Sequence, residues 1–233
     1  MHTTTFDIVG FDLDGTLLDS HADLGAAVNH ALALAGRPPV PIGEVRALIG
    51  GGGRTMLRRA LALTGGVPEA EFDALHSALV DYYEANIAVH SRLFPGALAM
   101  LDVLAAAGVK LAVVSNKLER LSVRVLEELG LASRFYTIIG GDTMGKGRAK
   151  PSRHPIDAMI ARAGGGRAVF VGDTTYDIGA ARAAGIPSVA VSFGFNDLPP
   201  EELGADVIIR HFDELIPALA KLCSRPSQAA LCD

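Results

Sequence analysis

Apolar and polar residues follow two different rhythms along the chain, and the change between them divides it. Residues Ile8–Leu13 form a short apolar run closed by an Asp-Gly pair, which is typical of a buried parallel strand ending in a tight turn. Apolar residues then recur at helical spacing from residue 22, and further helical stretches are expected at about 44–64 and 69–90. This part of the chain therefore reads as one strand followed by an all-helical block.

After residue 96 the pattern changes to helices that alternate with short apolar strands. The expected strands are Lys110–Val114, Tyr136–Ile139, Ala168–Val171, Ser188–Val191 and Val207–Ile209. Such alternation implies right-handed β-α-β crossovers and a parallel sheet with helices on both faces. The predicted fold class is α/β, a doubly wound parallel sheet interrupted after its first strand by an inserted helical domain.

This organisation predicts three segments. Residues 1–19 and 93–223 are expected to form the α/β core, and residues 20–92 the helical insert. Residues 224–233 contain Pro226 and little periodicity, so we expect a frayed tail.

Composition narrows the class of protein without deciding its chemistry. Of 233 residues, 49% are hydrophobic and 20% charged, which indicates a globular chain. The net charge of -5 disfavours a nucleic-acid partner. The only cysteines, Cys223 and Cys232, build no disulfide framework, and we find no export signal or membrane span. We expect a cytoplasmic protein, monomer or homodimer, with no membrane partner.

Candidate chemistry gathers where the expected strands end. In an open parallel sheet, ligands bind beyond the carboxyl ends of the strands, so these positions are the informative ones. The polar residues that follow the strands, or the segment after the third strand, are Asp12, Asp14, Ser115, Asn116, Lys150, Asp173 and Asp177. We therefore expect one site that several strands build together.

Carboxylates brought together at one edge of the sheet require a cation. Two unit charges about 4 Å apart repel by about 4 kcal/mol at an effective dielectric constant near 20. The candidate ligands are oxygen atoms without histidine or cysteine, which points to a hard divalent ion, with Mg²⁺ as the natural choice and zinc disfavoured. Mg²⁺ is thus the expected cofactor.

The order of these residues resembles a known superfamily. The segments Asp12-Leu13-Asp14-Gly15-Thr16, Ser115-Asn116, Lys150-Pro151 and Gly172-Asp173-x-x-x-Asp177 look like the four ordered motifs of the haloacid dehalogenase superfamily. The resemblance covers essentially the whole chain. Within the superfamily, the first motif and the helical insert are similar to those of phosphoglycolate phosphatases and their close relatives. The second aspartate favours phosphoryl transfer over dehalogenation, because a departing halide needs no acid.

The resemblance implies a role for each motif residue in catalysis. Asp12 would attack phosphorus and become an aspartyl phosphate, while Asp14 would protonate the leaving alkoxide and then activate water. Ser115 and the backbone N–H of Asn116 would bind phosphoryl oxygens, and Lys150 would offset their charge. Lys146 lies just upstream, so the sequence leaves open which lysine fills this position.

The same resemblance implies a ligand set for Mg²⁺. Asp12, the main-chain carbonyl of Asp14 and Asp173 would hold the ion, while Asp177 would brace it through water or orient Lys150. Thr16, in the first motif, is expected to contact the substrate.

Substrate choice is expected to come from the helical insert acting as a cap. Its most unusual feature is a run of glycines, Gly50, Gly51 and Gly52 among them, followed by Arg54 before a helical pattern. This loop could present N–H groups and a guanidinium to a substrate carboxylate, or it could be a flexible linker.

The resulting prediction is a Mg²⁺-dependent phosphatase that hydrolyses a small phosphorylated metabolite, with 2-phosphoglycolate as the expected substrate. One alternative is a phosphomutase of the β-phosphoglucomutase kind, which returns the phosphoryl group to a sugar. A second is a non-catalytic binding module that keeps the fold without the activity.

Overall fold

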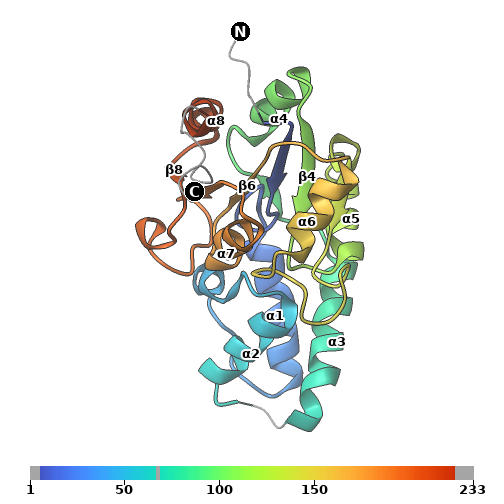
Figure 1. Ribbon diagram of the computed structural model, residues 1–233. Helices are drawn as coiled ribbons and strands as arrows, with labels where there is room; N and C mark the ends of the chain where they lie inside the picture. Colours follow the sequence, from blue (N-terminus) through green and yellow to red (C-terminus); the bar gives the residue numbers. More distant parts are fainter. Residues whose placement is uncertain (1–5, 67–68, 224–233) are drawn as a thin grey trace.

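Six parallel strands form the centre of the protein, seen here in a computed structural model that describes residues 6–66 and 69–223 (Figure 1). Across the sheet they follow the order β5 (Thr137–Ile139), β4 (Lys110–Val114), β1 (Ile8–Phe11), β6 (Ala168–Gly172), β7 (Ser188–Val191) and β8 (Val207–Ile209). Every neighbouring pair is parallel. The predicted doubly wound sheet is confirmed, with the first strand at its centre.

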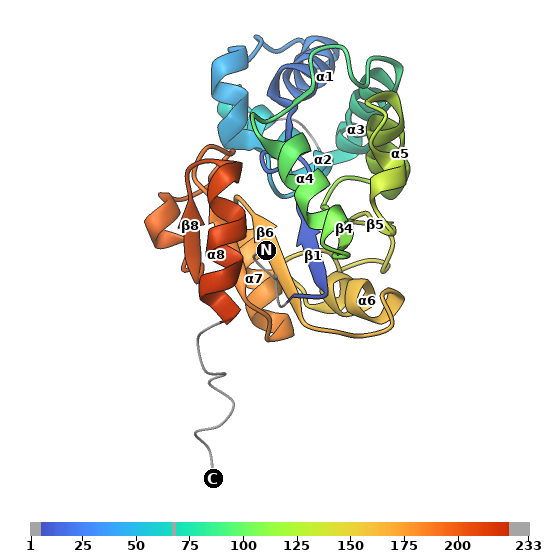
Figure 2. The same cartoon turned by 90° about the horizontal axis from the view of Figure 1, so that it is seen from above.

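Helices cover both faces of this sheet (Figure 2). One apolar cluster joins it to α4 (Ala97–Ala106), α5 (Glu119–Glu128) and α8 (Leu215–Cys223), and another joins it to α6 (His154–Arg162) and α7 (Thr175–Ala184). Because side chains alternate along a strand, Val9 and Phe11 pack in the first cluster and Ile8 in the second. Short 3₁₀ turns complete the core: η2 (Ala132–Arg134), η3 (Pro200–Glu202) and η4 (Phe212–Glu214).

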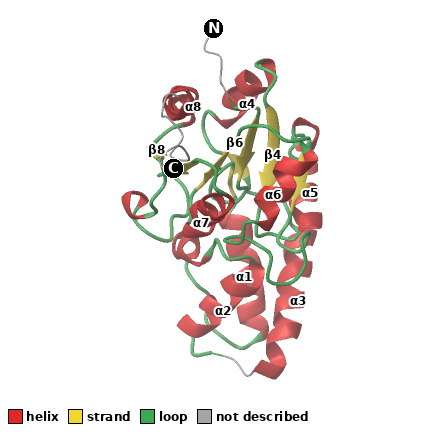
Figure 3. Cartoon of the chain, in the orientation of Figure 1, coloured by secondary structure: helices red, strands yellow, loops and turns green. Residues whose placement is uncertain are grey.

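The block between the first two core strands is helical, and it forms the lower half of the molecule in Figure 3. It consists of α1 (His21–Leu34), η1 (Ile42–Leu48), α2 (Gly53–Leu63) and α3 (Glu69–Ala85). The stretch expected at 44–64 is not one helix. It breaks because Gly50 and Gly52 take φ of 121° and 83°, which a helix does not allow.

Two short antiparallel strands, β2 (Leu18–Asp19) and β3 (Arg92–Leu93), carry the chain into and out of the helical block. Buried Asp23 fastens this junction, because it accepts hydrogen bonds from the backbone N–H groups of His90 and Ser91. The domain boundaries at residues 20 and 92 stay predictions, although the chain crosses between the two parts close to them.

None of the helices in the described ranges combines the length and the apolar character that crossing a bilayer requires. Cys223 lies half-buried and unpaired at the end of α8. Cys232 and the predicted tail at 224–233 lie outside the described residues.

Candidate active site

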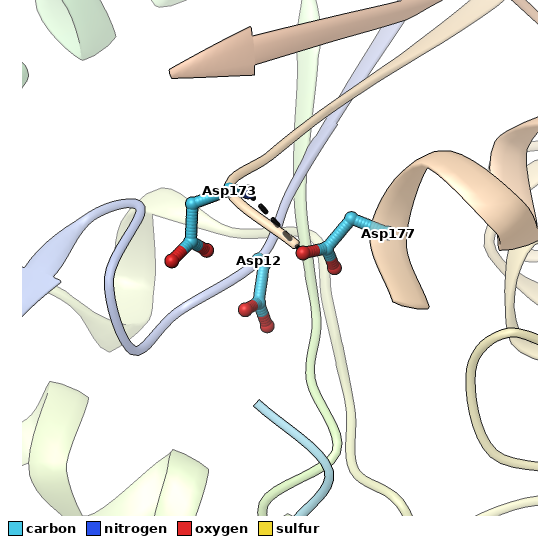
Figure 4. Close-up of side chains that lie close together, drawn as sticks. All are labelled: Asp12, Asp173 and Asp177. Atoms are coloured by element: carbon cyan, nitrogen blue, oxygen red, sulfur yellow. Dashed lines mark hydrogen bonds between the residues drawn. The ribbon is translucent and has the colours of Figure 1, made fainter. Parts of the chain in front are cut away.

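Two adjacent strands and the helix that follows one of them bring the acidic residues to one edge of the sheet. Asp12 follows β1, and Asp173 follows β6, which is the neighbour of β1. Asp177 lies in the first turn of α7, and the three carboxylates lie close together in Figure 4. One oxygen from each lies within 4.8 Å of the others, and all three side chains are buried.

The chain turns sharply directly after Asp14, where it lies against the side chain of Asp173, and this turn requires glycine. Gly15 has φ of 89°, and a Cβ there would lie 2.1 Å from Oδ2 of Asp173. Any side chain would collide with the carboxylate as well as strain the backbone. The Asp-x-Asp-Gly pattern is therefore what allows β1 to bring its aspartates against β6.

Burial makes the ionised form of these carboxylates costly. Burial raises the pKa of Asp12 to about 7, and repulsion from Asp177 adds to the shift, although Lys150 opposes it. Burial and the same kind of repulsion raise the pKa of Asp173 well above its ordinary value. A divalent cation among them would hold both groups ionised, so the oxygen-only cluster fits a hard metal ion.

Lys150 places a positively charged side chain against the acidic cluster. Its Nζ lies 2.8 Å from Oδ1 of Asp12 and 2.5 Å from Oδ1 of Asp177. Attraction to both carboxylates raises the pKa of Lys150 even though burial opposes this shift. Lys146 is exposed, so the structure brings Lys150 and not Lys146 to the cluster.

Both carboxylate oxygens of Asp177 accept hydrogen bonds from other groups of the protein. Its Oδ2 accepts hydrogen bonds from the backbone N–H groups of Asp173 (3.2 Å) and Thr174 (2.9 Å), which makes it part of the capping box of α7. Its Oδ1 faces Lys150. Of the two roles expected from sequence, this geometry matches the orientation of the lysine.

A cavity of about 300 Å³ opens above the cluster, between the sheet and the helical block. From the core it is lined by Asp12, Asp14, Ser115, Asn116, Lys117 and Lys150. The opposite wall comes from α1, α2 and α3 and is largely apolar, with Leu24, Met56, Leu79 and Val80. Most of the charged side chains that a small polar molecule would meet therefore lie on the core side, with Arg54 on the opposite wall.

Comparison with known proteins places this constellation in a family. A family model for haloacid dehalogenase-like hydrolases matches residues 9–191, which is more than half of the chain. The chain belongs to the haloacid dehalogenase-like hydrolases. The match spans the sheet from β1 to β7, so it includes every strand that carries a candidate catalytic residue.

Relatives of this haloacid dehalogenase-like (HAD-like) hydrolase can be aligned with it over nearly their whole length. A phosphoglycolate phosphatase from Agrobacterium fabrum is 45% identical, over 94% of this chain and 95% of the relative. One from Caulobacter vibrioides is 40% identical, over 97% and 98%. A crystal structure described as a predicted phosphoglycolate phosphatase from Haemophilus somnus superposes with a TM-score of 0.85 at 31% identity, covering 92% of this chain and 98% of that one.

Thr16, a predicted substrate contact, binds a neighbouring carboxylate with its side chain in this haloacid dehalogenase-like hydrolase. Thr16 is fully buried and is not among the residues that line the cavity. Its hydroxyl donates a hydrogen bond to Oδ1 of Asp173 at 2.8 Å. The N–H of Phe195 donates to Oδ2 of the same carboxylate at 2.7 Å. The hydroxyl of Thr16 therefore orients a candidate metal ligand, and a contact between Thr16 and substrate stays a prediction.

The glycine loop reaches the cavity as expected. Gly50, Gly51 and Gly52 line it, and the side-chain amide of Asn116 donates to the carbonyl of Gly50 at 3.2 Å. Arg54 also lines the cavity, but its guanidinium lies 2.6 Å from Asp73 on the surface. Contact between these groups and substrate stays a prediction.

Sequence patterns assigned no role to two residues that contact Asp14, or to a third that contacts one of them. Ser20 donates to Oδ1 of Asp14 at 2.6 Å, and the Nζ of Lys117 lies 2.8 Å from the same oxygen. Lys117 also donates to the hydroxyl of Tyr83, on α3, at 2.6 Å. The sequence feature that could have identified Lys117 is its position directly after Ser115-Asn116, which places a lysine at the same edge of the sheet.

Proposed function

We propose that this chain hydrolyses a small phosphate monoester, with 2-phosphoglycolate as the substrate and Mg²⁺ as the cofactor. The observation that carries the proposal is the position of Asp12, on the cavity floor beside Lys150 and two residues before a second buried aspartate. The relatives named phosphoglycolate phosphatase support this choice of substrate.

Asp12 has the position of a nucleophile in this reaction. Its carboxylate would attack phosphorus, so that the new P–O bond to Asp12 forms as the ester P–O bond breaks. Asp14 would give its proton to the leaving alkoxide oxygen and would then take a proton from water, which attacks the aspartyl phosphate and releases inorganic phosphate. The carboxylate of Asp12 is thereby restored.

The surroundings of Asp12 suit the negative charge that gathers on the phosphoryl group. Ser115 lines the cavity and Lys150 lies beside the nucleophile, so a hydroxyl and an ammonium would face the phosphoryl oxygens. Bound Mg²⁺, held by Asp12 and Asp173 with help from the main chain at Asp14, would supply further charge neutralisation. All of these groups belong to the core, and their arrangement around Asp12 supports phosphoryl transfer at this site.

Two further assignments accompany the proposal. We infer a cytoplasmic location from the sequence, since its two cysteines build no disulfide framework. The partner is a small phosphorylated metabolite, and a monomer or homodimer stays the predicted assembly.

The deciding experiment compares phosphate release by the wild type, Asp12→Asn and Asp7→Asn, with Mg²⁺ and 2-phosphoglycolate. Asp7 is an exposed acid at the opposite end of β1, so its substitution controls for the loss of one carboxylate from the same strand. We expect Asp12→Asn to lose about a thousandfold or more in kcat and Asp7→Asn to stay near wild type. Undiminished release by Asp12→Asn would contradict the proposal.

Substrate identity needs its own comparison. Ethyl phosphate has a similar size to 2-phosphoglycolate without the carboxylate, so the ratio of their kcat/KM values measures carboxylate recognition. β-Glucose 1-phosphate tests the phosphomutase, because free phosphate marks hydrolysis whereas an isomeric sugar phosphate marks the mutase. Equal values for the first two esters would argue against phosphoglycolate, and no turnover of any ester would favour the non-catalytic module.

A further inference from the structure

Lys117 is a buried cation that joins the core to the helical block. It follows β4, is 8% exposed, and lines the cavity beside Asp14. Its Nζ lies 2.8 Å from Oδ1 of Asp14 and 2.6 Å from the hydroxyl of Tyr83. One ammonium therefore touches both a candidate catalytic carboxylate from the core and a side chain of α3.

The donors to Asp14 converge on a single oxygen. Ser20, at the start of α1, donates to Oδ1 at 2.6 Å, and Lys117 donates to the same atom. In the described part of the chain, no protein hydrogen bond to Oδ2 accompanies them, and Asp14 lines the cavity. Oδ2 is thus the oxygen left to exchange a proton with the leaving group and with water.

Tyr83 fixes the position of the lysine from the other side. It is 2% exposed, and the Nζ of Lys117 lies 4.5 Å from the centre of its ring as well as against its hydroxyl. Burial raises the pKa of the Tyr83 phenol, so this hydroxyl stays neutral and accepts a hydrogen bond from the ammonium. The contact exists only while α3 rests on the core, because Tyr83 belongs to the insert.

We propose that Lys117 and Tyr83 are positioning residues that aim Asp14 at the leaving group when the helical block closes over the core. The proposal rests on the proposed function, in which Asp14 is the general acid. When the insert lifts away, Lys117 loses Tyr83 and the restraint on Asp14 weakens. Proton delivery is in this way coupled to closure by one hydrogen bond across the cavity.

A competing role for Lys117 is direct binding of a substrate carboxylate. Two of its three N–H groups already serve Asp14 and Tyr83, and both partners are buried with it. Binding a substrate carboxylate would leave the ammonium with one free N–H, or would take it from Asp14. The contacts therefore favour positioning, and the two roles differ in which kinetic constant they change.

The test uses leaving groups of different basicity. Ethyl phosphate expels a strongly basic alkoxide that needs a proton, whereas p-nitrophenyl phosphate expels a phenolate that leaves without one. Tyr83→Phe removes only the hydroxyl, and Tyr82→Phe, on the same helix, is the matched control because Tyr82 stacks on His30 away from the cavity. Single-turnover measurements with Mg²⁺ follow the first chemical step for each ester.

We expect Tyr83→Phe to slow the first step with ethyl phosphate about tenfold to a hundredfold, which is part of the contribution of a general acid. The burst of p-nitrophenolate should keep its wild-type rate, and KM should stay within about twofold for both esters. Lys117→Met should show the same selectivity with a larger loss, while Tyr82→Phe should match the wild type. Thermal unfolding of each variant verifies that it is folded.

Three outcomes would overturn the inference. These are an unchanged rate for Tyr83→Phe with ethyl phosphate, an equal loss with both esters, and a rise in KM confined to 2-phosphoglycolate, which would assign Lys117 to carboxylate binding. Release of p-nitrophenolate that depends on Asp12, whether at the wild-type rate or slower, keeps the phosphatase assignment intact in each case. Failure of the proposed function is a separate result, seen as turnover by Asp12→Asn.

Discussion

A lysine between two buried aspartates balances charge at the nucleophile. Lys150 lies within 2.8 Å of Asp12 and 2.5 Å of Asp177, and all three side chains are nearly excluded from water. Removing one partner of a buried ion pair leaves the other charge uncompensated, which costs about 3–5 kcal/mol. Stability and activity should therefore depend on the same ammonium group.

We predict that Lys150→Met lowers kcat about a hundredfold or more, because the transferring phosphoryl group loses its neighbouring cation. It should also lower the free energy of unfolding in the absence of metal by a few kcal/mol. Lys146→Met is the matched control, since this lysine is exposed. Phosphate release and urea unfolding measure the two effects, and equal behaviour of the two variants would refute this role for Lys150.

The raised pKa of Asp12 predicts a pH dependence of stability in the metal-free protein. The folded state holds this proton up to about pH 7, whereas the unfolded chain releases it near its ordinary pKa of 3.8. The contribution of this proton to the free energy of unfolding is therefore complete below about pH 4, and it is lost as the pH rises toward 7. Asp12→Asn removes the ionisation and should remove this part of the decline.

Urea unfolding of the wild type and Asp12→Asn in chelator, at several pH values, measures the difference. We expect the wild type to lose stability relative to the variant by a few kcal/mol between about pH 4 and 7, at about 1.4 kcal/mol for each pKa unit. Saturating Mg²⁺ should reduce the decline, because the ion favours the carboxylate. A constant difference at every pH would contradict the raised pKa.

At the scale of elements, the glycine loop between η1 and α2 is one place where the helical block contacts the core directly. Gly52 has φ of 83° and ψ of 169°, a conformation that is essentially confined to glycine. A Cβ there would lie 2.8 Å from the carbonyl oxygen of Asn116, on the core side of the cavity. The loop therefore closes against Asn116 without room for a side chain.

We predict that Gly52→Ala lowers kcat/KM about tenfold or more, because the insert can no longer rest on Asn116 in the same position. Gly36→Ala is the control, since Gly36 also has positive φ, at 66°, but faces open space. Its cost should be limited to about 1–2 kcal/mol of backbone strain, with activity unchanged. Steady-state kinetics and thermal unfolding separate the two, and unchanged kinetics for Gly52→Ala would contradict the close fit.

The strands and the core site were predictable because each carries its own local signal. A buried parallel strand is a short apolar run, and the chemistry lies at its carboxyl end, so Asp12, Ser115 and Asp173 followed from pattern alone. The pair β2 and β3 was not predicted, because two residues contain no periodicity. Lys150 was one of the partners expected for Asp177, whereas the contact of Thr16 with Asp173 could be identified only from the folded chain.

The contacts that cross between the insert and the core could not be predicted. Tyr83 and Lys117 are 34 residues apart and belong to different parts of the fold, so no spacing rule connects them. Arg54 illustrates the same limit, since the glycine loop before it suggested an anion site but no spacing rule pointed to the ion pair of its guanidinium with Asp73. Pairing of long side chains depends on how the two parts pack, which is absent from local pattern.

For the molecule as a whole, a cation in the acidic cluster should act as a stabilising ligand. A ligand at about 100 times its Kd adds about 2.7 kcal/mol, which corresponds to a rise in Tm of roughly 5–10 °C for a chain of this size. We predict such a rise for the wild type on adding Mg²⁺, and its loss on adding chelator. Asp173→Asn should abolish most of it, and an unshifted Tm in the wild type would contradict the metal site.

The junction at β2 and β3 has one more consequence. Leu18 pairs with Leu93 and Asp19 with Arg92, so the chain leaves the sheet layer and returns to it at adjacent points. A tight turn of a few residues could bridge that gap in a shortened chain, whatever length is removed between them. Replacing residues 20–91 by a different insert would accordingly leave the entry and exit points at β2 and β3, and with them the strand order of the sheet, unchanged.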